Sequence, residues 1–156
     1  MSISAVLTKI VQGCLASLLL ASSAGADTFG VVKVDARSMI MVNINTIAVT
    51  PEGYKRAWVA TAWSGQQANN LYSIQDYIEY DCARRRYRII STTTYGRDYS
   101  PLKTFEYKVV WRRERLKSDL YIGSNVVCNT LGVGGGLVTG DEFALIQSYR
   151  GVAAKK

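Results

Sequence analysis

The residues with the clearest chemical potential are a cysteine and the arginines after it, in the stretch EYDCARRRYR from Glu79 to Arg88. A thiol beside cations can have a lowered pKa, and the thiolate is the nucleophilic form of cysteine. The same arginines could bind anions, because a guanidinium donates paired hydrogen bonds to phosphate and carboxylate groups. Three interpretations follow: a catalytic thiol, a nucleic-acid contact, or a structural cysteine beside a basic surface.

The chain contains no histidine. This removes the Ser-His and Cys-His pairs that activate nucleophiles, and the commonest metal ligand. Carboxylate pairs could still act as acid and base, but no apolar pocket that would raise a pKa is visible around Asp76, Glu79 and Asp81. We expect these three to be solvated strand residues. The sequence therefore predicts no catalytic residue, no metal site and no cofactor.

The N-terminus has the pattern of a secretory signal peptide. Lys9 precedes an uncharged run from Ile10 to Ala26 that ends in three small residues, which predicts cleavage before Asp27. A retained anchor is an alternative, but the run is shorter and less apolar than a membrane span of roughly 20 residues. Lipid attachment at Cys14 is another, although the most apolar part of the run follows that cysteine. We predict an exported protein with no transmembrane segment in the mature chain.

Cleavage of the signal peptide would leave two cysteines, Cys82 and Cys128. In an oxidising compartment two thiols most simply form one disulfide. The bridge would close a loop with 45 residues between the two cysteines. In the chain-entropy description, such a bridge stabilises the folded protein by about 4 kcal/mol. Cys82 is then oxidised, which argues against the catalytic interpretation.

The mature chain opens with strand-like segments. FGVVKV, SMIMVNINTIAV, YKRAWVATAW and YSIQDYIEYDC are rich in β-branched and aromatic residues, as strands are. Pro51 and Gly53 indicate a turn between two of them. In the last segment Ile78, Tyr80 and Cys82 share one parity, so the cysteine is expected on the buried face. Residues 83–86 are predicted to connect a hairpin.

The second half of the domain is predicted to end in a helix. Residues 96–103 are expected to form a loop and residues 104–111 a strand. Ser118 followed by Asp119 is typical of a helix N-cap and first turn, which predicts a short helix ending near Cys128. The expected fold is α+β: an antiparallel meandering β-sheet with one C-terminal helix packed on it and tethered by the disulfide.

The chain changes character after Cys128. GVGGGLVTG, residues 132–140, contains five glycines and is interpreted as a flexible connector; it lacks the Lys-Ser/Thr of a phosphate-binding loop. The periodicity of DEFALIQSYR does not decide between a strand and a helix. We therefore divide the chain into a signal peptide (residues 1–26), a sheet-plus-helix domain (27–128) and a glycine-rich C-terminal extension (129–156).

The positive charge is concentrated in one region. The chain has 19 Lys and Arg against 12 Asp and Glu, a formal charge of +7, and the excess lies between Arg84 and Lys117. Two clusters, RRRYR and RRERLK, each stand at the end of a predicted strand and would merge at one rim if those strands were neighbours. The predicted basic patch comprises Arg84, Arg85, Arg86, Arg88, Arg112, Arg113, Arg115 and Lys117.

Two interpretations of this patch stay open. It could bind acidic proteins or glycans, or it could be a solvated surface that only keeps the protein soluble. Nucleic acid suits the charge, but export argues against it, so no nucleic-acid partner is predicted. If Arg84, Arg85 and Arg86 are surface residues, their replacement by serine should change stability by no more than about 0.5 kcal/mol.

The order of these segments resembles the surface-adhesin protein E family of small exported proteobacterial proteins. AWVATAW leads through a polar loop to YDCARRRYRIIS and TTTYG, then to a strand with Trp111 and a helix that ends at Cys128. The resemblance implies a non-enzymatic adhesin, in the periplasm or at the outer-membrane surface, that binds extracellular-matrix and serum proteins and can form a homodimer. It extends over about residues 29–128. The alternative is a periplasmic structural or envelope-assembly component, with the glycine-rich tail docking onto a partner.

Overall fold

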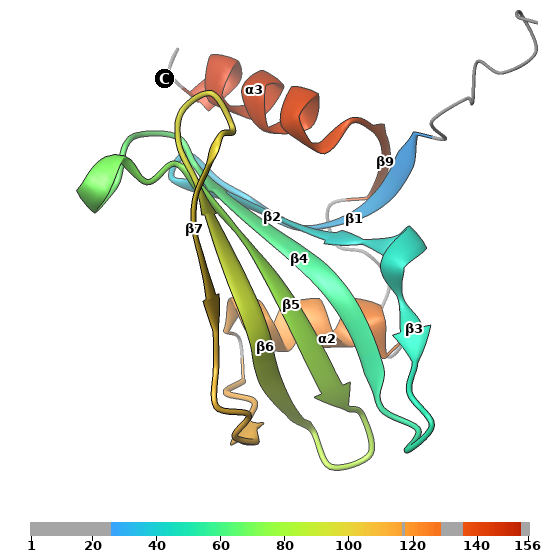
Figure 1. Ribbon diagram of the computed structural model, residues 1–156. Helices are drawn as coiled ribbons and strands as arrows, with labels where there is room; N and C mark the ends of the chain where they lie inside the picture. Colours follow the sequence, from blue (N-terminus) through green and yellow to red (C-terminus); the bar gives the residue numbers. More distant parts are fainter. Residues whose placement is uncertain (1–25, 117, 129–135, 154–156) are drawn as a thin grey trace, which may run out of the picture.

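The computed structural model describes residues 26–116, 118–128 and 136–153, which form one antiparallel sheet with two α-helices (Figure 1). The predicted signal peptide, apart from Ala26, lies outside these residues. No helix in the described ranges has the length and apolar character needed to cross a membrane. The strands are β1 (Asp27–Val34), β2 (Ser38–Asn43), β3 (Ala48–Val49), β4 (Lys55–Trp63), β5 (Ser73–Asp81), β6 (Arg86–Tyr95), β7 (Pro101–Glu106), β8 (Arg112–Arg113) and β9 (Leu137–Gly140), and the helices are α2 (Asp119–Val127) and α3 (Glu142–Ala153).

The sheet is a meander with one addition from the C-terminal part of the chain. Its order is β7-β6-β5-β4-β2-β1-β9, with β3 paired to β4 and β8 paired to β6. From β1 to β7 the long strands follow one another, as short antiparallel connections favour. β9 then pairs with β1 at the opposite edge, from Asp27 to Gly30. The predicted antiparallel meander is confirmed.

Each face of the sheet is covered by one helix. On one face Val42, Val59 and Ile78 pack with Val126 and Val127 of α2. On the other face Phe29, Met41 and Ala60 pack with Ile146 and Tyr149 of α3. Alternate residues of each strand point to opposite faces, so the near-continuous burial of β2 follows from its place between the two helices.

Helix α2 begins and ends as the sequence predicts. The Oγ of Ser118 accepts a hydrogen bond from the Tyr121 N–H at 3.1 Å, which satisfies one of the free donors of the first turn. At the other end Cys128 is disulfide-bonded to Cys82, with a Cα–Cα distance of 5.7 Å. The predicted disulfide and the helix that it tethers to the sheet are confirmed.

The predicted strand over residues 104–111 is wrong in its bounds. β7 begins at Pro101, inside the expected loop, and ends at Glu106. Proline is tolerated at the start of an edge strand because the missing N–H is not needed there. The β5–β6 pairing shifts by one residue at Ile90, and such a bulge increases the local twist. The pairing of β7 with β6 ends at Glu106, near this bulge, and the chain pairs with β6 again only at Arg112.

The glycine-rich segment is not a connector along its whole length. Residues 137–140 form β9, hydrogen-bonded to β1, while residues 132–135 lie outside the described part. DEFALIQSYR is helical: Asp141 accepts from the Ala144 N–H at 2.9 Å as an N-cap. Ile146 of α3 is fully buried against the sheet. The expected single helix is therefore joined by a second one on the opposite face.

Raising the pH should weaken the docking of α3. The half-buried carboxylate of Glu142 accepts hydrogen bonds from Tyr99 and from Gln75. Burial is the main cause that raises its pKa, and the charges of Asp141 and Asp27 add to the effect. Because the pKa of Glu142 is higher in the folded protein than in the unfolded chain, the stability that Glu142 contributes is fully present at low pH. It is lost as the pH rises through the folded pKa.

Glu142→Gln removes this titration and is the variant that measures it. We expect the variant to be more stable than the wild type at about pH 8 and close to it at about pH 5. Urea unfolding followed by tryptophan fluorescence gives both free energies of unfolding. A wild type that is the more stable of the two at the higher pH would contradict this account.

Candidate functional site

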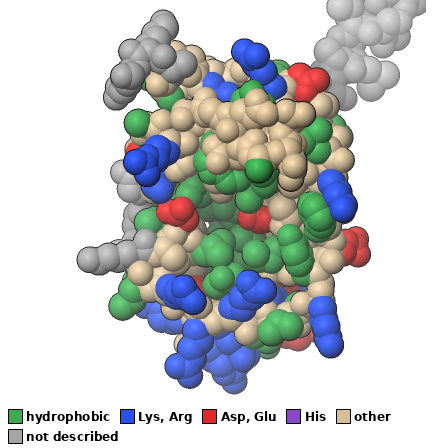
Figure 2. All heavy atoms as spheres, turned by 90° about the vertical axis from the view of Figure 1, so that its left-hand side faces the viewer, with side chains coloured by type: hydrophobic (Ala, Val, Ile, Leu, Met, Phe, Trp, Pro, Cys, Tyr) green, Lys and Arg blue, Asp and Glu red, His purple; other side chains and the backbone are tan. Residues whose placement is uncertain are grey.

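The structure brings the two arginine clusters together at one end of the sheet. β8 pairs with β6, so that Arg113 lies opposite Arg86 and Arg112 lies opposite Tyr87. Figure 2 shows Lys and Arg side chains gathered at the lower end of the molecule, where Figure 1 places the β5–β6 turn. Lys117 lies outside the described residues. We call the basic rim the set Arg84, Arg85, Arg86, Arg88, Arg112, Arg113 and Arg115.

The centre of the rim is built on a buried carboxylate. Glu79 has no exposed side-chain area, and its neighbours in the register are Arg56 on β4 and Arg88 on β6. Oε2 accepts from Arg56 Nε at 2.6 Å, and Oε1 accepts from Arg88 Nε at 2.6 Å. The bond to Glu79 is the main cause that raises the pKa of Arg56. One carboxylate thus joins three strands.

A second buried carboxylate holds the turn that follows. Asp81 is 3% exposed; its Oδ2 accepts from Arg86 Nε at 2.9 Å and from Arg84 Nη1 at 3.2 Å. Its Oδ1 accepts from the Arg84 backbone N–H at 3.1 Å. Burial acts to raise the pKa of Asp81, but the bonds from Arg86 and Arg84 outweigh it and lower the pKa.

The expectation that Asp76, Glu79 and Asp81 are solvated is wrong. All three are buried, at 8%, 0% and 3% exposure. Glu79 and Asp81 are buried because cross-strand arginines cover them. Asp76 points to the other face and accepts a hydrogen bond from the Thr92 hydroxyl, and burial raises its pKa. Burial alone does not make them an acid–base pair.

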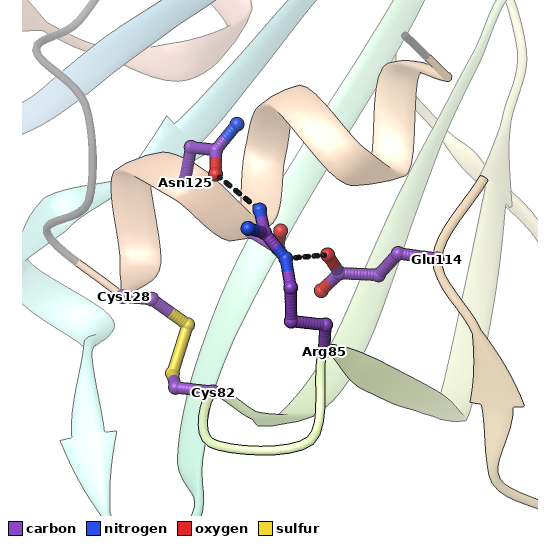
Figure 3. A pocket seen from close by; sticks show the side chains of 6 residues that line it. Cys82, Arg85, Glu114, Asn125 and Cys128 are labelled. Atoms are coloured by element: carbon purple, nitrogen blue, oxygen red, sulfur yellow. Dashed lines mark hydrogen bonds and ion pairs between the residues drawn. A yellow bond between two sulfur atoms is a disulfide. The ribbon is translucent and has the colours of Figure 1, made fainter. Parts of the chain in front are cut away.

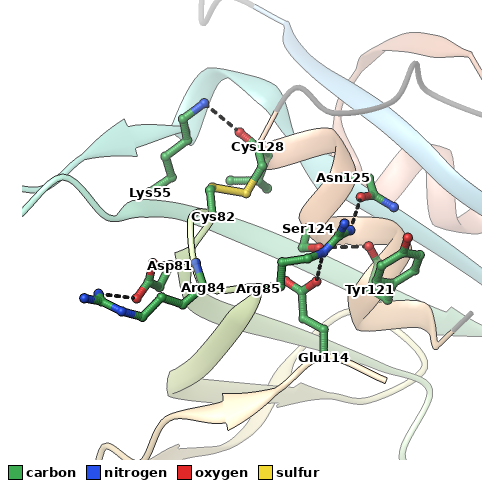
Figure 4. Close-up of a disulfide and its surroundings, with 11 residues drawn as sticks. Lys55, Asp81, Cys82, Arg84, Arg85, Glu114, Tyr121, Ser124, Asn125 and Cys128 are labelled. Atoms are coloured by element: carbon green, nitrogen blue, oxygen red, sulfur yellow. Dashed lines mark hydrogen bonds and ion pairs between the residues drawn. A yellow bond between two sulfur atoms is a disulfide. The ribbon is translucent and has the colours of Figure 1, made fainter. Parts of the chain in front are cut away.

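Arg85 connects the turn to α2 and to the segment before it. Its Nε lies 3.8 Å from the Glu114 carboxylate, whose side chain is 4% exposed, and its Nη2 donates to Asn125 Oδ1 at 3.3 Å. Figure 3 shows these groups converging beside the disulfide, around a cavity of about 50 Å³. Figure 4 shows Tyr121 on the same side, with the guanidinium 5.0 Å from its ring centroid.

Aromatic rings cover the arginines of the rim. The guanidinium carbons of Arg86 and Arg88 lie 4.7 and 4.5 Å from the Trp111 ring centroid. Tyr54 meets Trp111 edge-on at 4.9 Å. Such cation–π contacts contribute roughly 0.5–1 kcal/mol each at exposed sites. The sequence predicts that Trp111 lies in a strand. In the structure it lies outside the strands, and its ring packs against the guanidinium groups of Arg86 and Arg88.

The predicted patch therefore contains two kinds of arginine. Arg84, Arg85, Arg86 and Arg88 are held by carboxylates and rings. The arginines of the segment 112–115 are exposed, and across the described ranges no carboxylate lies within 4 Å of them. Replacing Arg84 to Arg86 by serine would leave the carboxylates of Asp81 and Glu114 without their partners, so the expected effect of at most about 0.5 kcal/mol no longer holds.

The arrangement offers electrostatic contact with anionic groups. Cys82 and Cys128 are oxidised, and the rim carboxylates are occupied by arginines. In the described part of the chain no group of His, Cys, Asp and Glu could hold a metal ion. Fold and site together define a small disulfide-tethered sheet domain with a rigid basic rim.

A comparison with protein families places this domain. The family model of surface-adhesin protein E matches residues 30–129, so the chain belongs to the surface-adhesin protein E family. The match includes the rim and both cysteines and ends before β9 and α3. Searches of curated proteins and of solved structures each found no match.

Proposed function

We propose that the protein is an exported, non-enzymatic binding protein of the adhesin type, whose basic rim contacts an acidic segment of another protein. The observation that carries this proposal is the group of exposed arginines at 112–115, which have no carboxylate partner among the described residues and lie beside arginines that ion pairs hold in place. An arginine whose position is set in advance loses less conformational freedom when it binds a carboxylate. Family membership supports both export and an adhesin role.

The surface beside the rim supports a protein as the partner over a glycan. Figure 2 shows hydrophobic side chains directly above the basic end. Protein interfaces are enriched in aromatic residues and arginine, which is the mixture found here. The exposed apolar side chains between the middle of β7 and the end of the segment that carries the exposed arginines are Phe105, Tyr107, Val109, Val110 and Leu116.

The alternative, an envelope-assembly component that docks through its tail, finds less support. It requires the tail to be available to a partner. In the described part of the tail, β9 is hydrogen-bonded to β1, and Ile146 and Tyr149 of α3 are buried against the sheet. This part of the tail is therefore engaged within its own chain, which favours the rim as the contact surface.

Binding to an acidic peptide should depend on the unpaired arginines. We expect the double variant Arg112→Gln, Arg113→Gln to bind a polyglutamate peptide at least about tenfold more weakly than the wild type, since each charged hydrogen bond contributes about 1.5–3 kcal/mol. Wild-type affinity should also fall as salt is raised. Fluorescence anisotropy of the labelled peptide measures both effects.

The matched control removes the same charge elsewhere. Arg37→Gln, Lys103→Gln also loses two exposed cations but leaves the rim intact, and it should retain most of the affinity. Equal losses in the two double variants would mean that net charge alone attracts the peptide. Stronger binding of heparin than of polyglutamate would assign the rim to sulfated glycans instead.

A further inference from the structure

The end of the sheet opposite the basic rim carries a second group of cations, in a cleft. The cleft has a volume of about 460 Å³ and lies between the β4–β5 loop, the β6–β7 loop and α3. A volume of this size is typical of small-molecule sites. Its described lining contains two arginines and no carboxylate, and includes Gln66, Tyr72, Arg97, Gln147 and Arg150.

Arg150 is a buried cation, and among the described residues only neutral groups form hydrogen bonds with it. It is 9% exposed; its Nε donates to the Trp63 carbonyl at 3.3 Å and its Nη1 to the Arg97 carbonyl at 3.2 Å. Its Nη2 has no hydrogen-bond partner among the described residues. Across the same residues no carboxylate lies within 4 Å of the guanidinium. Burying a charge without a counter-charge is costly.

The surroundings of Arg150 offset only part of the cost of burying its charge. The guanidinium carbon lies 4.8 Å from the Tyr72 ring centroid, which offsets part of the lost hydration. Burial is the main cause that lowers the pKa of Arg150, and the like charge of Arg97 lowers it further. Arg97 itself is exposed at the mouth of the cleft. Two cations face one space that has no anion of its own.

We propose that this cleft binds a small organic carboxylate between Arg97 and Arg150. The free Nη2 of Arg150 would donate to one carboxylate oxygen, with Arg97 closing on the ligand from the exposed side and Tyr72 forming a flat wall. A guanidinium suits this geometry because its N–H groups lie in the plane of a carboxylate. A monoanion is sufficient to neutralise the one cation that is buried.

The C-terminal extension builds this site. Arg150 and Gln147 belong to α3, which lies outside residues 30–129 that match the family. The cleft is therefore an addition to the shared domain, made where α3 packs on the end of the sheet. It is separate from the basic rim, so the inference does not depend on the proposed function.

The test is a titration of the folded protein with defined carboxylates. Succinate represents a free acid, N-acetyl-diglycine represents the carboxylate end of a peptide, and N-acetyl-diglycine amide is the neutral control. In ¹H–¹⁵N spectra we expect at least one of the two acids to shift the amides of residues 64–66 and 147–151 in a saturable way, and the amide to shift none. Whichever acid binds more tightly identifies the source of the carboxylate.

Variants then assign the contact to the two arginines. Arg97→Gln should weaken binding about tenfold, as expected for the loss of a charged contact, while Lys108→Gln, which removes an exposed cation elsewhere, should not. Arg150→Met removes two hydrogen bonds to backbone carbonyls and so changes the packing of α3 as well as the cleft. Arg150→Lys with retained α3 signals is therefore the second variant, and it should also bind more weakly. Absence of saturable shifts with both acids, shifts reproduced by NaCl at equal ionic strength, or equal binding of inorganic phosphate would each overturn the proposal.

Discussion

Glu79→Gln should be one of the most destabilising single substitutions in this domain. The glutamine keeps the shape of the side chain but removes the charge that holds Arg56 and Arg88 from the two neighbouring strands. Glu79 has no exposed side-chain area, whereas the two arginines are 38% and 26% exposed. Removing one partner of a buried pair costs about 3–5 kcal/mol. The partial exposure of the arginines places the expected loss near the lower value, about 3 kcal/mol.

Chemical unfolding of matched variants measures this effect. Glu106→Gln makes the same chemical change on the exposed edge strand β7 and should alter the free energy of unfolding by no more than about 0.5 kcal/mol. The triple variant Glu79→Leu, Arg56→Met, Arg88→Met should recover much of the loss, because a buried ion pair can often be replaced by apolar packing. A Glu79→Gln protein as stable as the Glu106→Gln protein would show that this carboxylate network contributes nothing.

The same substitution separates stability from binding. Glu79 neutralises part of the rim, so Glu79→Gln releases Arg88 from its counter-charge while leaving Arg112 and Arg113 unchanged. Under the proposed function, the folded variant should bind polyglutamate at least as tightly as the wild type. The buried carboxylates then stabilise the rim without taking part in the contact, and the exposed arginines carry the affinity.

The strand pattern and the tethered helix could be predicted because they rest on local signals. Alternation in YSIQDYIEYDC placed Tyr80 and Cys82 on the buried face, and both pack in the core beneath α2. Ser118 followed by Asp119 predicted the helix start to the residue. Two cysteines behind a signal-like N-terminus predicted the disulfide. Each of these inferences needs only neighbouring residues or a simple count.

The carboxylate network could not be predicted because it depends on exact strand register. With the turn at residues 83–86, Asp81 would face Arg88. The turn is at residues 82–85, so Asp81 faces Arg86 and Glu79 faces Arg88. A shift of one residue thus decides which charges are opposite one another. The alternation of acids before the turn with arginines after it was the available signal, and it was interpreted as solvated surface.

The role of the tail depends on contacts that are distant in sequence. Leu137 to Gly140 carry no strong strand pattern of their own, and they become a strand because β1 offers an unpaired edge. The buried face of α3 is fixed by contacts with Phe29 and Met41. Glycine content alone favoured a connector. Tertiary pairing overrides such a local tendency, as it often does in sheets.

Removal of the disulfide is the second change from which a large effect is expected. Cys82→Ser, Cys128→Ser should lower the free energy of unfolding by about 2–5 kcal/mol, since the bridge closes a sequence separation of 46 residues. The bridge joins the C-terminus of α2 to the β5–β6 turn (Figure 4). Hydrogen exchange should therefore increase more in α2 than in the central strands β4 and β5, because local opening follows the lost tether.

The serine variant also supplies its own control. Dithiothreitol should destabilise the wild type to about the level of the variant and leave the variant unchanged, and alkylation of the mature wild type before reduction should modify no thiol.

Because Arg85 of the turn contacts both Glu114 and α2, loosening the helix should also disturb the segment that carries Arg112 and Arg113. Weaker polyglutamate binding by the folded variant is then expected, although neither cysteine lies in the exposed part of the rim. A variant that keeps the stability and the exchange pattern of the wild type would show that packing beneath α2, and not the bridge, holds the helix.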